Sequence, residues 1–488
     1  MASDQAEAAV RAGSGVLAAT CIATLIVNAN TSAVSILLPA ISEDVGASTA
    51  TLQWAVTGYS LVGAAVIVTS GVLGDIIGRR RTFVGALVLF IVCCVLIALS
   101  DNATGVIVGR MLQGAAGATL LACGLSLLSV AATGQEQLRA VSIWGAASAI
   151  GAAAGPLIGG ALVDTTGWQG LFWIDAVIAA LCIPLTLRTV AESNDPTRPR
   201  SLDIGGTVLV ALILAPLVLG LSEGSNWGWT SPATLGCLAV SVASIFGFVA
   251  VERRVRAPLI DLQLLRNRVL VGATIAILIG AGTINGLMYV LSLFFQDPDG
   301  FDMSPMEAGL ATLPATIGLV ATAPLVAGLA FKIGTRQAIG LGFAITTAGF
   351  GVLVFLSVSW TYALFVLPLI AIAVGMGFSN GCSSSAATAS VPREEVGAAS
   401  GVSNMARYVG AALFTAAAAT IYGTNSTATD VARSEAVVDG VSAAALLMAI
   451  TSALGILLAV LAGRHRPGPT RPVDRAAAAA VVVHTMPT

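Results

Sequence analysis

The sequence predicts an all-α integral membrane protein with fourteen apolar segments that cross the bilayer. Three observations predict this fold class. Of the 488 residues, 56% are hydrophobic and only 10% are charged, whereas soluble domains contain roughly a quarter charged residues. The apolar residues form runs of about 20 residues, the length that crosses a hydrocarbon core as a helix. The basic residues collect in alternate connecting segments, which is the positive-inside bias of membrane proteins.

The N-terminal half of the chain begins with a polar tail, 1–15, that lacks the basic region of a signal peptide and is expected to be cytoplasmic. Residues 16–187 are predicted to form a six-helix bundle. Its spans are expected at 16–41, 52–73, 82–99, 105–131, 140–163 and 170–187. A polar cytoplasmic linker, 188–203, follows this bundle.

Two extra central helices are expected within 204–251, at 204–222 and 233–251, and a second cytoplasmic linker covers 252–268. Residues 269–463 are predicted to form the C-terminal six-helix bundle. Its spans are expected at 269–295, 305–331, 337–356, 362–389, 396–422 and 440–463. The tail 464–488 contains Pro and Arg followed by an Ala- and Val-rich run too short to span, so we expect a disordered cytoplasmic tail.

The distribution of charge tests the number of spans. With fourteen spans the expected inner segments hold almost all arginines, and the expected outer loops hold only Arg433. The outer loops instead collect acids such as Glu43, Asp44 and Asp101. Because one span more or fewer would mix the two groups, both termini are predicted to be cytoplasmic.

Several function classes are disfavoured by the residues present. The two histidines, His465 and His484, both lie in the tail, and no acids cluster, so no catalytic set is visible and we do not expect an enzyme. The seven cysteines lie in apolar runs without metal-ligand spacing, so no metal is expected. There is no phosphate-binding loop of the P-loop type, which disfavours ATP as the energy source.

The loop between the second and third expected spans reads GVLGDIIGRRR from Gly71 to Arg81. Its glycines, Gly71 and Gly78, permit close helix approach and a sharp turn, while Asp75 can pair with a cation or a helix N-terminus. An ordinary positive-inside loop with an incidental acid is the alternative. The spacing resembles the signature loop of the major facilitator superfamily, G-x-x-x-D-x-x-G-R-[RK]. This resemblance implies a latch between two helical halves, made by Gly71, Asp75, Gly78, Arg79 and Arg80.

Arg110 lies well inside the fourth expected span, with Gln113 one helical turn later. An arginine within a span is costly and is usually functional or paired, although it can also reach back to the outer headgroups. The stretch is similar to the R-x-x-Q-G motif of the superfamily, whose arginine is implicated in proton coupling.

The fifth expected span carries small residues at every fourth position, Gly151, Gly155 and Gly159, together with Pro156. Small residues at this spacing allow close helix packing, and proline removes one backbone hydrogen bond. The stretch resembles the antiporter motif found in exporters of the superfamily, so the resemblance implies export.

Further matches extend the resemblance over nearly the whole chain, to the fourteen-span drug:proton antiporter family. They include Gln53 and Tyr59 in the second span, the linker from Glu252, and Asn404 with Arg407 in the thirteenth span. The resemblance implies two six-helix bundles, with two extra helices between them in sequence that pack at the periphery. It also implies a proton gradient as the energy source and no cofactor. Arg407, a second arginine within an apolar helix, is either functional or reaches to the cytoplasmic surface.

Two departures from the family pattern concern acids. Asn30 occupies the position of the usual first-span aspartate and cannot titrate. Asp175 instead brings a carboxylate into the sixth span, at a depth similar to that of Arg110. A buried carboxylate beside an arginine suits a proton carrier; the alternative is a solvated cap at the outer rim. A third departure is Phe331 in the repeat of the signature loop, where an acid is common.

The sequence therefore predicts a proton-coupled antiporter that exports hydrophobic or amphiphilic small molecules such as drugs or antibiotics. The alternative is a dedicated metabolite or lipid exporter with weak or no proton coupling. The expected proton-coupling residues are Arg110, Asp175 and Asp75; the expected cavity residues are Asn30, Gln53, Tyr59, Gln113, Asn285, Tyr289, Asn380, Asn404 and Arg407. We expect a monomer in the bacterial inner (plasma) membrane, with a small-molecule substrate and lipids as partners and no nucleic acid.

Overall fold

Helices are the only regular elements in the described part of the chain. The computed structural model describes residues 2–131, 134–193, 202–255, 258–315, 317–319, 321–322, 333–391, 395–426 and 432–461. Eleven helices in these ranges are long and apolar enough to cross a membrane. The all-helical membrane fold predicted from the sequence is thereby confirmed at this level.

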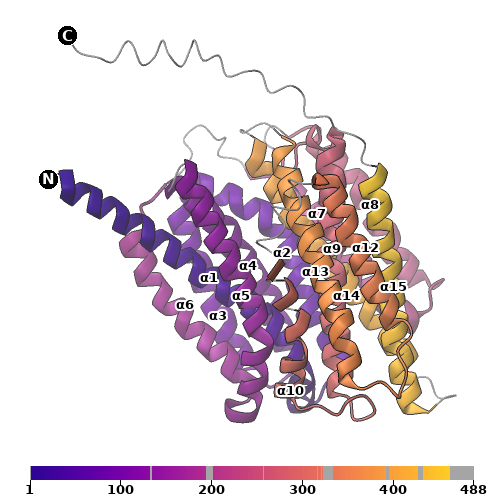
Figure 1. Cartoon of the computed structure of the whole chain (residues 1–488). Helices are drawn as coiled ribbons and strands as arrows, with labels where there is room; N and C mark the ends of the chain where they lie inside the picture. The colour runs from indigo at the N-terminus through magenta and orange to yellow at the C-terminus, as the bar shows by residue number, and fades with distance from the viewer. Residues whose placement is uncertain are drawn as a thin grey trace, which may run out of the picture.

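Six helices form the N-terminal half, drawn indigo to magenta in Figure 1. They are α1 (Ala2–Val45), α2 (Thr49–Ile77), α3 (Arg79–Ala98), α4 (Ala103–Ala131), α5 (Gly134–Thr166) and α6 (Gln169–Thr189). α1 packs along α5, α2 packs along α4, and α3 lies between α4 and α6. Helices close in sequence are therefore not always partners, and residues from α1, α4 and α6 can meet inside the bundle.

Two helices follow the N-terminal half, α7 (Ile204–Trp227) and α8 (Pro232–Glu252). Both begin at a side-chain cap: Asp203 accepts the N–H of Gly206 at 2.6 Å, and Ser231 accepts that of Thr234 at 3.2 Å. α7 packs against α2 and α14, one helix from each half, and α8 packs against α7. The two extra helices therefore cover one side of the junction between the halves.

The C-terminal half contains the short helix η1 (Leu264–Arg266) and then the long α9 (Arg268–Gln296). It continues with α10 (Pro305–Ala311), α12 (Thr335–Leu353), α13 (Tyr362–Ala389), α14 (Val396–Ser426) and α15 (Arg433–Leu461). α9 packs on α14, and α12 packs on α13 and α15. The two halves meet along α2 with α14 and α5 with α10.

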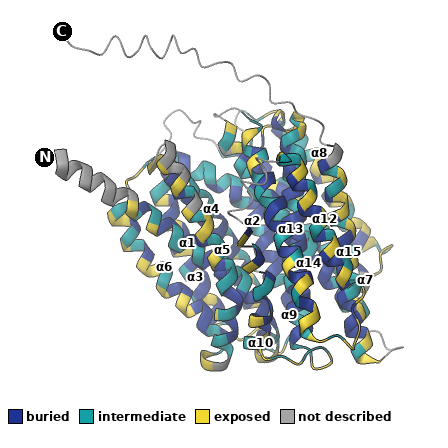
Figure 2. Ribbon diagram, viewed as in Figure 1, coloured by how far each residue is buried: buried dark blue, intermediate teal, exposed yellow. Residues whose placement is uncertain are grey.

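The outer faces of the helices are apolar, as a lipid environment requires. Leu367 of α13 is 75% exposed, Phe246 of α8 72% and Leu181 of α6 68%. Figure 2 shows buried residues on the faces between helices and exposed residues on the outside. Exposed side chains of this size on several helices match a surface that faces lipid.

Helix bounds differ from the predicted ones mainly at polar ends. α2 runs from Thr49 to Ile77 rather than over 52–73, and α15 begins at Arg433 rather than at residue 440. α1 begins at Ala2, so the expected tail 1–15 is largely helical. Hydrophobicity marks the part of a helix that fits the hydrocarbon, whereas backbone hydrogen bonds continue beyond it.

The expected count of fourteen spans exceeds the eleven candidates by three segments, 305–331, 337–356 and 396–422. The last two are helices, α12 and α14, and the first is described only in part, beginning with α10. Residues 194–201 of the first expected linker, Phe331 and the expected tail 464–488 lie outside the described residues.

Candidate functional site

The side chain of Arg110 lies inside the N-terminal half, about 10 Å along α4 from its start. It is fully buried, and its Nε donates to the carbonyl oxygen of Ala55 in α2 at 3.1 Å. The guanidinium carbon lies 4.4 Å from the ring centroid of Tyr59, a cation–π contact. This burial does not fit the alternative in which the guanidinium reaches the headgroups.

Asn30 of α1 bridges Arg110 and Asp175. The Arg110 Nη1 donates to Asn30 Oδ1 at 2.5 Å, and Asn30 Nδ2 donates to Asp175 Oδ2 at 2.7 Å. An amide can accept from the cation and donate to the carboxylate at once, which an ionised aspartate at position 30 would be unable to do. Asn30 is fully buried and Asp175 is 4% exposed, so Asp175 is not a cap at the surface.

Gln113 completes this set of polar groups, which we call the Arg110 network (Asn30, Arg110, Gln113 and Asp175). Its Oε1 accepts from Arg110 Nη1 at 2.6 Å, and its Nε2 donates to Cys94 Sγ at 3.1 Å. Among the described residues, Arg110 and Asp175 make no direct ion pair, because Asn30 lies between them. With Asp175 ionised the network is electrically neutral.

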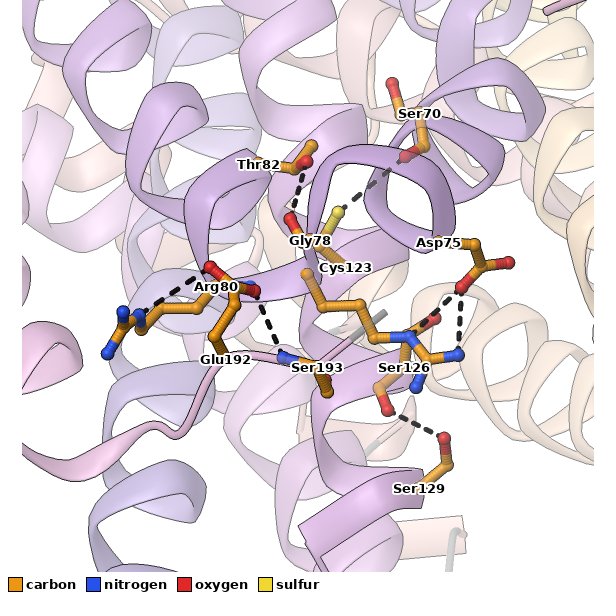
Figure 3. A network of polar contacts seen from close by, with 11 residues as sticks. Ser70, Asp75, Gly78, Arg80, Thr82, Cys123, Ser126, Ser129, Glu192 and Ser193 are labelled. Carbon is orange, nitrogen blue, oxygen red and sulfur yellow. Dashed lines mark hydrogen bonds and ion pairs between the residues drawn. The ribbon is translucent and has the colours of Figure 1, made fainter. Parts of the chain in front are cut away.

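The α2–α3 connection holds the residues expected to form a latch (Figure 3). Arg79 bonds Asp75 Oδ1 through Nε at 3.0 Å and through Nη2 at 2.9 Å. The Arg79 backbone N–H donates to the carbonyl oxygen of Ser193 at 2.9 Å. The segment after α6 is thereby fixed to the start of α3. A Cβ on Gly71 would meet no atom within 4 Å, so this glycine is not required for close packing here.

Glu192 is a residue of this connection that the sequence analysis missed. Its carboxylate accepts the backbone N–H groups of Arg80 at 3.1 Å and Arg81 at 3.2 Å, and so caps α3. Gly78 has a φ of 121°, and a Cβ there would lie 2.5 Å from Glu192 Oε1. Gly78 is therefore required for both the turn and the cap. One feature of the sequence could have indicated this role. Glu192 is an acid just after the sixth expected span, on the same side of the membrane as the basic loop between the second and third spans.

The glycines of α5 face α1. A Cβ at Gly151 would collide with the carbonyl oxygen of Leu25, one at Gly155 with that of Ala29, and one at Gly159 would lie 3.2 Å from Ala33 Cβ. The small residues thus permit close backbone contact, as their spacing indicated.

The other face of α5 meets the C-terminal half. A Cβ on Gly309 of α10 would lie 2.5 Å from the Pro156 carbonyl oxygen, and one on Gly160 would lie 2.6 Å from that of Pro305. α5 therefore packs tightly against both α1 and α10. The contacts of Pro156 and Gly160 with α10 lie at the end of the molecule where α1 connects to α2, which we call the α1–α2 end.

Hydrogen bonds also join the halves at the α1–α2 end, in a group that we call the α1–α9 seam. Pro39 lies inside α1 and has no N–H, so the Ser35 carbonyl lacks its usual intrahelical donor. Ser292 of α9 donates its hydroxyl to this carbonyl, and Gln296 Nε2 donates to the Ile36 carbonyl at 3.1 Å. The expected cavity residue Tyr289 lies nearby, 3.5 Å from the carbonyl oxygen of Thr49.

The remaining expected cavity residues either contact another part of the molecule or bond only their own helix. Gln53 reaches out of its half and donates to Ser222 of α7 at 3.2 Å. Asn285 and Asn404 are partly exposed and donate to carbonyls one turn earlier in their own helices, at 2.8 and 3.1 Å. Tyr59 approaches the other half, with its ring centroid 6.5 Å from that of Tyr408 in α14.

Arg407 of α14 is partly exposed. Its Nη2 donates to Ser384 Oγ of α13 at 2.6 Å. Asn380, one turn before Ser384, packs against α9, where a Cβ on Gly280 would lie 2.8 Å from Asn380 Oδ1. Arg407 therefore contacts α13 at Ser384, and Asn380 lies one turn away on the same helix with its amide against α9.

Comparison with known proteins identifies the family. The family model described as Major Facilitator Superfamily matches residues 20–415. The chain is 30% identical over 400 residues to a tetracenomycin C resistance and export protein of Streptomyces glaucescens, covering 82% of this chain and 74% of that protein. It is 32% identical over 409 residues to the multidrug efflux pump LfrA of Mycolicibacterium smegmatis, covering 83% and 80%.

A solved structure supports the fold. The human organic anion transporter MFSD10 matches with a TM-score of 0.62 and 14% identity, covering 92% of this chain and 99% of that one. The chain belongs to the Major Facilitator Superfamily.

Proposed function

We propose that the chain is a proton-coupled exporter of hydrophobic or amphiphilic small molecules, a transporter rather than an enzyme. Its similarity to antibiotic export and multidrug efflux proteins supports the direction and the substrate class. The proposal includes two six-helix bundles with α7 and α8 between them in sequence, fourteen spans, and both termini in the cytoplasm of a bacterial cell. The charge distribution of the loops supports this orientation.

The Arg110 network is the observation that carries the proton coupling. With Asp175 ionised, one buried cation and one buried anion balance each other through Asn30. A proton on Asp175 would leave the buried guanidinium uncompensated and would weaken the bond from Asn30 Nδ2, because a neutral carboxyl oxygen is a weaker acceptor than a carboxylate. Because an unpaired buried charge costs several kcal/mol, protonation would favour a conformation that gives the guanidinium another partner.

α1 carries this change toward the rest of the molecule. Asn30 lies on α1 about 8 Å along the axis from Ser35, whose carbonyl takes part in the α1–α9 seam. A shift of α1 on protonation of Asp175 would therefore act on the contacts that join the halves. In the proposed orientation the seam is extracellular, so its opening would release substrate outward. Because antiport carries the proton inward, the proton would bind Asp175 from outside while the seam is open and would leave toward the cytoplasm after the seam has closed.

Transport in proteoliposomes tests the proposal. Wild-type protein should accumulate a lipophilic substrate such as ethidium against its gradient when a pH gradient is imposed. Asp175→Asn keeps the shape and one acceptor oxygen for Asn30 but is unable to bind and release a proton, so we expect at least about a tenfold loss of gradient-driven uptake. Asp101→Asn, at an exposed acid next to α4, is the matched control and should behave as wild type.

Downhill exchange of substrate between the two sides is measured in the same vesicles. If Asp175→Asn retains exchange but loses accumulation, Asp175 carries the coupling proton. Full accumulation by Asp175→Asn would overturn its role. No accumulation by the wild type with any probe would favour a metabolite or lipid exporter without proton coupling.

A further inference from the structure

Arg407 carries a positive charge that no described acid balances. It lies about 16 Å along α14 from the start of the helix, and its one described hydrogen bond goes to the neutral hydroxyl of Ser384. In the described ranges no Asp or Glu lies within ion-pair distance of its guanidinium. The side chain points across to α13, so it does not reach along α14 to the membrane surface.

Two buried polar groups without described partners lie one helical turn from this arginine or from its hydrogen-bond partner Ser384. Ser403 lies one turn before Arg407 on α14, and its buried hydroxyl has no hydrogen-bond partner among the described residues. Asn380 lies one turn before Ser384 on α13, and its buried Oδ1 likewise lacks a described partner. Asn404 lies on the Arg407 face of α14 and uses only its Nδ2, in a bond to its own helix. Together with Ser384 and Arg407 these residues form what we call the Arg407 cluster.

Such a set of groups is costly unless a ligand or water completes it. A guanidinium has five N–H donors in a planar fork that fits an oxyanion, and a serine hydroxyl adds another donor. Asn380, whose Oδ1 lacks a described partner, can also turn its NH2 toward an acceptor, since the two ends of an amide exchange by rotation. Partial exposure of Arg407 provides access, whereas the Arg110 network is sealed.

We propose that the Arg407 cluster binds the acidic group, a carboxylate or similar oxyanion, of the small molecule that the protein exports. This proposal rests on the proposed export function only in saying that the bound molecule is then exported. Arg407 supplies the charge, Ser384 orients the guanidinium, and Ser403, Asn380 and Asn404 supply neutral hydrogen-bonding groups. The apolar part of the ligand would lie against the neighbouring helices, so the preferred ligand is an amphiphile with one negative charge.

Three pyrene probes separate charge from hydrophobicity: 1-pyrenebutyrate, 1-pyrenebutanol and 1-pyrenebutylamine. Their binding to the purified full-length protein is followed by energy transfer from tryptophan, without any gradient. We expect the wild type to bind the butyrate about 10- to 100-fold more tightly than the alcohol, the range of a charged hydrogen-bonded contact. Arg407→Gln should remove this difference, and Arg407→Lys should keep part of it. Arg266→Gln, at an exposed arginine of η1, should leave the preference unchanged.

Two outcomes would overturn the proposal: equal binding of the butyrate and the alcohol by the wild type, or equal weakening of all three probes by Arg407→Gln. If Arg407→Gln does not fold, Ser384→Ala provides the test, with an expected three- to tenfold loss for the butyrate alone. Because the assay measures binding, loss of coupled transport with the anion preference intact would reject only the proposed coupling.

Discussion

Arg110 and Arg407 both lie in the interior of long helices, α4 and α14, and their surroundings differ in one respect that decides what each can do. Arg110 and Arg407 are both bonded by neutral side chains, an amide in one case and a hydroxyl in the other. Asp175 lies behind the amide of Asn30, whereas no described acid lies within ion-pair distance of Arg407. The first region is balanced and sealed, which suits an internal proton switch. The second is positively charged and accessible, which suits a receptor for an anion.

The largest expected difference between the two regions is in stability. Replacing each arginine in turn by glutamine should change the free energy of unfolding by different amounts. Arg110→Gln leaves Asp175 buried and uncompensated, so we expect a loss of about 3–5 kcal/mol in the free energy of unfolding. Arg407→Gln removes a charge that is already uncompensated, so we expect a change of less than about 1 kcal/mol. Unfolding can be followed with a thiol-reactive fluorophore, because Cys93, Cys94 and Cys123 are buried.

The double variant Arg110→Gln with Asp175→Asn serves as the control for this experiment. It removes both charges, and we expect it to recover a large part of the stability lost in Arg110→Gln. Equal losses in Arg110→Gln and Arg407→Gln would show that Arg407 has a buried acidic partner and would remove the distinction between the two regions.

The sequence predicted the elements of both regions but not their connections. Helical spans follow from local hydrophobicity, and the contacts of Gly155 with α1 follow from a local spacing. The bond from Arg110 to Asn30 joins residues 80 positions apart, and that from Asn30 to Asp175 joins residues 145 apart. No periodicity encodes such pairs. The sequence analysis therefore placed Arg110 and Asp175 at the same depth but did not predict the bridge through Asn30.

Glu192 and the α1–α9 seam show the same limit. Glu192 lies in a polar linker of ordinary composition, and only the folded chain brings its carboxylate to the N–H groups of α3. Pro39 was visible in the sequence as a proline inside an apolar run. That the carbonyl it frees is used by Ser292 depends on the packing of α1 against α9.

An acid introduced beside Arg407 should make its surroundings resemble those of Arg110, and we expect an effect of intermediate size on anion binding. In Asn404→Asp a carboxylate lies one turn from Arg407 on the same helix face, where it can pair with the guanidinium. We expect the affinity for 1-pyrenebutyrate to fall about tenfold, since the charge that attracts the oxyanion is now balanced. The affinity for 1-pyrenebutanol should not change. Unaltered binding of the butyrate would mean that its acidic group contacts another part of the protein.

The smallest expected effect concerns the link between the Arg110 network and the α1–α9 seam. Ser292→Ala removes the donor to the Ser35 carbonyl, which Pro39 leaves without an intrahelical partner. Loss of one hydrogen bond costs about 0.5–1.5 kcal/mol, so we expect amide hydrogen exchange in residues 35–45 to become about 2- to 10-fold faster. Ser359→Ala, in the exposed α12–α13 connection, is the matched control and should leave this segment unchanged.

The same hydrogen-exchange measurement on Asp175→Asn and Arg407→Gln tests which of the two regions is coupled to the α1–α9 seam. α1 carries both Asn30 and Ser35, so a change at Asp175 should also speed exchange in this segment. Arg407 lies on α14 and bonds only α13 in the described structure, so Arg407→Gln should not. If Arg407→Gln accelerated exchange as much as Asp175→Asn does, occupancy of the Arg407 cluster would itself act on the seam. Anion binding and proton binding would then control the same contact, and the assignment of separate roles to the two arginines would be wrong.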